Sequence, residues 1–137
     1  MEHPIVHEPD DPFVERVRRI CLAYPESVET FGHGRPRFKA GKRVFVTVGS
    51  EMRIPHSITF TPAEEERGAW LEDERFWSPK YDGPSGKLAF DAGLDAGLDG
   101  DDSRTLDDVD WALIAELIDT SYRQVALQRQ LRALDAR

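Results

Sequence analysis

The sequence contains a single cysteine, Cys21, and no long hydrophobic run. One cysteine excludes a disulfide within the chain and is typical of a protein of a reducing compartment, so we expect a cytoplasmic location. No apolar stretch approaches the roughly 18 residues that a membrane-spanning helix needs. The first residues, M-E-H-P-I-V-H-E-P-D-D, are acidic and lack the hydrophobic region of a secretory signal. We therefore expect no membrane partner.

Motifs of the common enzyme classes are also missing. The sequence has no H-E-x-x-H, G-x-S-x-G, C-x-x-C, G-x-G-x-x-G or phosphate-binding Walker motif. His33 has no acidic residue or cysteine at a spacing typical of metal ligands. The repeat D-A-G-L-D-A-G-L-D-G-D-D (91–102) fails as an EF-hand loop, because Gly97 and Leu106 would occupy ligand positions. We expect a non-catalytic protein without a metal or other cofactor.

Charge is distributed unevenly along an acidic chain. The formal net charge is -8, which opposes bulk binding of nucleic acid at long range. The segment 32–50 contains no Asp or Glu and five basic residues, Arg35, Arg37, Lys39, Lys42 and Arg43. The segment 91–119 is the reverse, with ten acidic residues and one base, Arg104. A chain polarised in this way can present a basic surface despite its net charge.

The N-terminal half separates into a helical segment and a hairpin. Asp11 and Pro12 mark a helix start, and apolar residues at helical spacing predict an amphipathic helix that Pro25 ends. Two alternating runs flank Gly41 and predict a β-hairpin. Side chains alternate between two faces in the second strand of this hairpin. We expect the core face to carry Val44, Val46 and Val48. The opposite face would then carry Arg43, Phe45 and Thr47.

The C-terminal half adds strands and helices. We expect a strand over 56–61, a helix over 62–72, and two strands in R-F-W-S-P-K-Y and K-L-A-F-D. Beyond residue 108, the series Trp111, Ile114, Ile118, Tyr122 and Val125 predicts the strongest helix. The order α-βββ-α-ββ-α predicts a two-layer α+β fold, with a largely antiparallel sheet of about five strands against three helices. Residues 1–10 would form a flexible leader, 11–126 one domain and 127–137 a helical extension.

The last residues carry a second apolar series. Leu127, Leu131 and Leu134 continue at helical spacing but lie nearly opposite the stripe that begins at Trp111. Either the helix breaks near Ala126, or it has a second apolar face that needs a partner. A homodimer through this leucine stripe is one expectation, and a frayed tail is the alternative.

Two further features are candidates for a ligand pocket. Gly32-His33-Gly34 either presents an imidazole on a tight loop or is only the turn that leads into the hairpin. Trp77 and Tyr81 lie in an aromatic-rich segment that either lines a pocket, stacks on bases or packs in the core. Spacing leaves these alternatives open, and His33, Trp77 and Tyr81 remain candidates for a small-ligand pocket.

Three segments follow one another in an order that is more specific than any of them alone. They are V-R-R-I-C-L-A-Y-P-E-S-V-E-T-F-G-H-G-R-P-R-F-K-A-G-K-R-V-F-V, D-E-R-F-W-S-P-K-Y and A-E-L-I-D-T-S-Y-R-Q-V-A. Together they resemble the MmcQ/YjbR-like family over roughly residues 12–126, with the acidic segment 91–110 as an insertion. The resemblance implies a compact α+β fold similar to secretion chaperones and to the CyaY-like arrangement. It also implies DNA binding through a double wing of strands.

Three functions fit these features, and DNA binding is the one we favour. In this hypothesis Phe45 packs against a sugar or base, and phosphates are contacted by the basic hairpin residues Arg35, Arg37, Lys39, Lys42 and Arg43. The first alternative is a chaperone-like protein-interaction module whose basic hairpin meets an acidic partner. The second is a small-ligand-binding protein with its pocket near His33, Trp77 and Tyr81.

Overall fold

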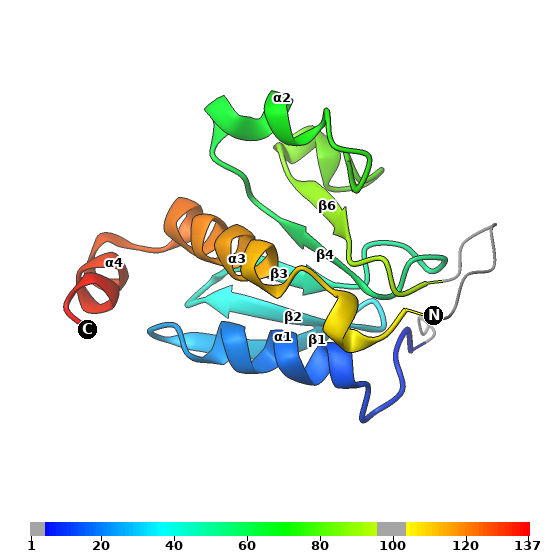
Figure 1. Cartoon of the computed structure of the whole chain (residues 1–137). Helices are drawn as coiled ribbons and strands as arrows, with labels where there is room; N and C mark the ends of the chain where they lie inside the picture. Colours follow the sequence, from blue (N-terminus) through cyan, green and yellow to red (C-terminus); the bar gives the residue numbers. More distant parts are fainter. Residues whose placement is uncertain (1–4, 96–103) are drawn as a thin grey trace.

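The computed structural model describes residues 5–95 and 104–137 and has two layers, a sheet and a set of helices (Figure 1). Every paired strand is antiparallel to its neighbour, in the order β1-β2-β3-β4-β6-β5. The strands of this sheet are β1 (Ser27–Gly32), β2 (Arg35–Ala40), β3 (Arg43–Val48), β4 (Ser57–Phe60), β5 (Phe76–Trp77) and β6 (Leu88–Asp91). The predicted α+β class is confirmed, with six strands in place of about five.

Helices α1 and α3 lie across one face of this sheet (Figure 1), and their buried side chains share one core with it. The α-helices are α1 (Pro12–Leu22), α2 (Arg67–Trp70), α3 (Trp111–Val125) and α4 (Gln128–Asp135). Short 3-10 turns lie at Glu64–Glu66, Gly83–Ser85 and Leu106–Asp108. Among residues 5–95 and 104–137, no helix is both long enough and apolar enough to cross a membrane.

The first helix begins where the sequence predicts it. The carboxylate of Asp11 accepts hydrogen bonds from the backbone N–H groups of Phe13 and Val14, at 2.9 and 3.3 Å. Pro12 occupies the first helical turn, where its missing N–H costs no hydrogen bond. The helix expected over 62–72 is shorter, because only Arg67–Trp70 is α-helical and a 3-10 turn precedes it.

Strand β1 precedes the predicted hairpin and was not expected from the sequence. It is the edge strand of the sheet and pairs with β2 along its whole length, from Ser27 opposite Ala40 to Gly32 opposite Arg35. Its alternation is concealed because Glu29 occupies a position on the helix side, where Arg18 of α1 donates to its carboxylate at 2.7 Å. The hairpin residues therefore lie inside the sheet, between β1 and β4, and do not form a free two-stranded ribbon.

A β-bulge in β3 reverses the predicted orientation of the three residues before Val46, which are Arg43, Val44 and Phe45. Phe38 pairs with Val46, but Lys39 pairs with Val44, so Phe45 has no partner of its own in the ladder. Phe45 and Val46 are consequently both buried. The Phe45 ring lies 5.2 Å from the ring of Tyr122, measured between centroids. The assignment of Phe45 to the nucleic-acid surface is therefore wrong, because its side chain is 1% exposed and belongs to the core.

The C-terminal residues fold back onto the domain. Ala126 has extended backbone angles (φ -70°, ψ 152°) and separates α3 from α4, as the first of the two alternatives for the tail required. Leu131 and Leu134 pack against the core of the same chain, whereas Leu127 is 54% exposed. Leu131 and Leu134 are thus partly buried by residues of their own chain. A homodimer through the leucine stripe stays a prediction.

Candidate functional site

The face of the sheet that is turned away from α1 and α3 carries the basic residues of β2. Because side chains alternate along a strand and Phe38 and Ala40 are buried in the core, Arg35, Arg37 and Lys39 point to the opposite side. The pairing of strands extends this side, which we call the open face, across the sheet. Its side chains include Val28, Thr30, Arg35, Arg37, Lys39, Val44, Thr47 and Thr59.

The basic residues form a row along one strand and its turn. Residues two apart in a strand are separated by about 7 Å, so the row from Arg35 to Lys39 is about 14 Å long. Lys42 and Arg43 are exposed at the turn between β2 and β3. Lys42 lies in the turn itself, whereas Arg43 pairs with the buried Ala40 and so projects from the helix side of the sheet. All five predicted cations therefore lie along β2 and the end that it shares with β3.

Most of these cations form no ion pair in the part of the chain that the structure describes. Among residues 5–95 and 104–137, no Asp or Glu forms an ion pair with Arg37, Lys39, Lys42 or Arg43. Arg35 is different, since its guanidinium donates to the carbonyl oxygens of His33 and Gly49. Arg35 joins the turn after β1 to the end of β3, and the other four cations are available to an anion.

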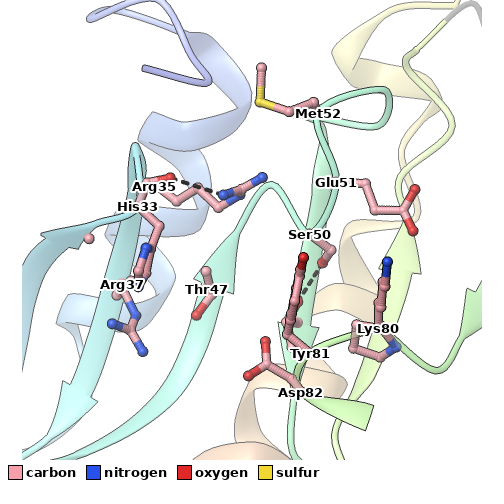
Figure 2. A pocket seen from close by; sticks show the side chains of 13 residues that line it. His33, Arg35, Arg37, Thr47, Ser50, Glu51, Met52, Lys80, Tyr81 and Asp82 are labelled. Carbon is pink, nitrogen blue, oxygen red and sulfur yellow. Dashed lines mark hydrogen bonds between the residues drawn. The ribbon is translucent and has the colours of Figure 1, made fainter. Parts of the chain in front are cut away.

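A cavity of about 750 Å³ lies over the open face at the Arg35 end of the row (Figure 2). On one side it is lined by His33, Arg35 and Arg37, and on the other by residues 79–82, which follow β5. Three hydroxyl side chains also line it, those of Thr47, Ser50 and Thr59. The hydroxyls of Ser50 and Thr59 are 2.5 Å apart and hydrogen-bonded to each other.

The Gly-His-Gly segment is a turn, and it also contributes to this cavity. His33 and Gly34 both have positive φ angles, 56° and 78°, and connect β1 to β2 as a two-residue hairpin turn. Histidine is one of the residues that adopt this conformation more readily than most. The turn places His33 beside Arg35 and Arg37 at the cavity wall (Figure 2).

Of the three residues predicted for a ligand pocket, two line this cavity. They are His33 and Tyr81, which are 48 residues apart in the sequence. Trp77 does not line it. Its backbone pairs with Ala89 of β6, and its indole N–H is buried with no hydrogen-bond partner among the described residues. The threonines of β3 and β4 were not predicted, because only the pairing of these strands brings them together.

A second polar cluster lies at the N-terminal end of α1, around His56. The two ring nitrogens of His56 each face a carboxylate, with Nδ1 2.8 Å from Asp95 Oδ1 and Nε2 2.7 Å from Asp11 Oδ2. The hydrogen bonds to Asp95 and Asp11 raise the pKa of His56 to about 9, against the opposing effect of burial. His56 is therefore an imidazolium at neutral pH, and it joins the cap of α1, the start of β4 and the first part of the acidic segment.

This cluster has the character of a structural ion pair. The neighbouring His7 ring lies 6.1 Å from His56 between centroids, and burial lowers the pKa of His7. His7 is hydrogen-bonded through Nε2 to the carbonyl oxygen of Pro55 at 2.6 Å. Within the described ranges, no group of three or more His, Cys, Asp or Glu side chains is arranged to hold a metal ion.

Comparison with known proteins gives one match. A family model described as YjbR matches residues 22–124, which is most of the chain and includes every strand of the sheet. The match confirms the resemblance seen in the sequence. No curated protein and no solved structure matches the chain.

Proposed function

We propose that this chain, which belongs to the YjbR family, is a non-catalytic protein that binds DNA through the open face of its sheet. The observation that carries the proposal is the row of cations along β2, in which Arg37 and Lys39 have no carboxylate partner among the described residues. A cytoplasmic location, expected from the cysteine content, is part of the same proposal.

The placement of two acidic residues, Asp95 and Glu29, supports this proposal. Asp95, in the acidic segment, is held by His56 through both a ring nitrogen and the backbone N–H, and so it does not cover the row on β2. Glu29, the acidic residue of β1, is paired with Arg18 on the helix side of the sheet. Within residues 5–95 and 104–137, these two carboxylates are thus held away from the row on β2.

Contact through the open face differs from insertion of a hairpin into a groove. With β1 and β4 hydrogen-bonded to its two edges, the β2–β3 pair can offer phosphates a surface but not a ribbon. The net charge of -8 repels DNA at a distance, so we expect weak binding that depends strongly on salt.

Measuring DNA affinity over a series of salt concentrations tests the proposal. If Arg37, Lys39 and Lys42 neutralise about three phosphates, the logarithm of the binding constant should fall with the logarithm of salt concentration at a slope of about -2.7. The double variant Arg37→Glu/Lys39→Glu should bind at least about tenfold more weakly, and its slope should be smaller in magnitude by about 2. Fluorescence anisotropy with a labelled DNA reports both quantities.

The matched control reverses the charge of two other exposed arginines. The double variant Arg19→Glu/Arg132→Glu makes the same change in net charge on α1 and α4, away from the open face. It should keep the wild-type slope. An equal loss in both double variants would mean that only net charge matters, and no wild-type binding at low salt would assign the open face to an acidic protein partner instead.

A further inference from the structure

We infer that the cavity on the open face selects single-stranded over duplex DNA by stacking one base on Tyr81. The inference rests on the proposed function, because it concerns the same face and the same polyanion. It adds the form of nucleic acid that the site takes and the residue that distinguishes the two forms.

The two long walls of the cavity differ in chemistry. The β2 wall carries Arg37, a cation without a carboxylate partner in the described part of the chain. The opposite wall carries Tyr81, whose side chain is 88% exposed, the highest exposure among the large hydrophobic side chains of the described residues. In Figure 2, Thr47 lies between Arg37 and Tyr81. The β2 wall therefore suits a phosphate, and the Tyr81 wall suits the flat ring of a base.

The charges around the cavity orient a nucleotide in one direction. Glu51 and Asp82 line the cavity, together with Lys80, whose Nζ lies 5.8 Å from the centre of the Tyr81 ring. The two carboxylates outnumber Lys80 on the side of Tyr81, so this side is less favourable for a phosphate than the β2 wall, which carries Arg35 and Arg37. A nucleotide would therefore place its phosphate toward Arg37 and its base toward Tyr81.

Hydroxyl groups between these walls provide hydrogen bonds for the base edge. Thr47, Ser50 and Thr59 come from β3, the connection after it and β4. The hydrogen bond between Ser50 and Thr59 uses one donor, which leaves two hydroxyl donors and the remaining acceptor positions for a base. A set of this kind can satisfy donors and acceptors on any of the four bases, so it favours binding without strong sequence preference. The volume of about 750 Å³ is in the usual range for small-molecule sites, so the cavity has room for a nucleotide.

Duplex DNA cannot use Tyr81 in this way. In a duplex each base is stacked on its neighbours and paired across the helix, so no base face is available to an aromatic side chain on a protein surface. In a single strand the bases are free to stack on such rings, and base–aromatic stacking contributes substantially to binding without sequence preference. The row on β2 can bind phosphates of both forms, and Tyr81 adds affinity for the single strand alone.

The test compares one strand in its two forms. An oligothymidine of about ten nucleotides, within the usual size of single-strand sites, is titrated alone and annealed to its complement at the same salt concentration. We expect the wild type to bind the single strand about tenfold more tightly than the duplex. Tyr81→Ala should weaken single-strand binding about tenfold and leave duplex binding within about twofold. Tyr81→Phe, which keeps the ring, should behave as wild type.

The control removes an exposed ring outside the cavity. Phe31 is 61% exposed and does not line the cavity, so Phe31→Ala should leave both affinities unchanged. If Tyr81→Ala binds the single strand as wild type does, or if the duplex binds as tightly as the single strand, the inference is overturned. Loss of affinity in Arg37→Glu/Lys39→Glu would still support DNA binding in that case. If neither form binds, the inference and the proposed function both fail.

Discussion

Phe45→Ala is expected to destabilise the protein by about 3–5 kcal/mol, the usual cost of removing a fully buried phenylalanine side chain from a core. Phe45 is 1% exposed and its ring has edge-to-face contacts with Tyr24 and Tyr122, at 6.1 and 5.2 Å between ring centroids. Tyr122 is itself fully buried and is anchored by a hydrogen bond to the carbonyl oxygen of Pro25 at 2.7 Å. The substitution leaves a cavity between β3, α1 and α3 that these anchored rings cannot fill.

Urea denaturation followed by circular dichroism measures this loss. Phe31→Ala is the matched control, because the same atoms are removed from a ring that is 61% exposed; its free energy of unfolding should change by less than about 1 kcal/mol. A small effect of Phe45→Ala, together with a loss of DNA affinity in the folded variant, would contradict the buried position and restore Phe45 to the surface.

The second large effect is a loss of stability at alkaline pH that depends on His56. The pKa of His56 is about 9 in the folded protein and 6.5 is its ordinary value, so folding favours the protonated ring. Below about pH 6.5 both states are protonated and the whole contribution is present. Between about pH 6.5 and 9 the unfolded chain loses the proton first, and the contribution declines until it is lost above pH 9. The rise of the pKa corresponds to at most about 3 kcal/mol.

His56→Gln should remove this dependence. The groups that face His56 are Asp11, Asp95 and His7, and the lowered pKa of His7 affects stability only toward acidic pH. Chemical denaturation at about pH 6 and about pH 9 should therefore show a wild type that loses about 2–3 kcal/mol more than the variant. His33→Asn, which retains a residue tolerant of positive φ, should lose as much as wild type. Equal losses in wild type and His56→Gln would mean that the ion pairs with Asp11 and Asp95 do not form.

Several elements could be predicted because their signals are local. Helix α1 has its cap, its proline and its apolar spacing within a dozen residues, and α3 repeats an apolar residue at every turn. The turn at Gly41 and the alternation of β2 likewise depend only on neighbours in the sequence. These signals were sufficient for the fold class and for the direction in which Arg35, Arg37 and Lys39 point.

The errors have a physical reason in each case. The edge strand β1 was missed because Glu29 occupies a helix-facing position, which is stable only since Arg18 comes from another element. Phe45 was placed on the wrong face because a bulge adds one residue to β3, and a bulge depends on how two strands are paired. Neither the partner of Glu29 nor the register of β3 is visible in the local pattern.

The sequence by itself determined the α+β class and the basic row on one side of β2, because periodicity, turn residues and charge act over a few neighbouring positions. Only the tertiary structure decided which side chains meet. The pairing of β3 with β4 brings Thr47 beside Thr59, and the course of the chain after β5 brings Tyr81 over the face that carries Arg37. Folding likewise places Asp11 and Asp95 on either side of His56. Contacts between residues so far apart in the chain depend on the packing of the whole domain.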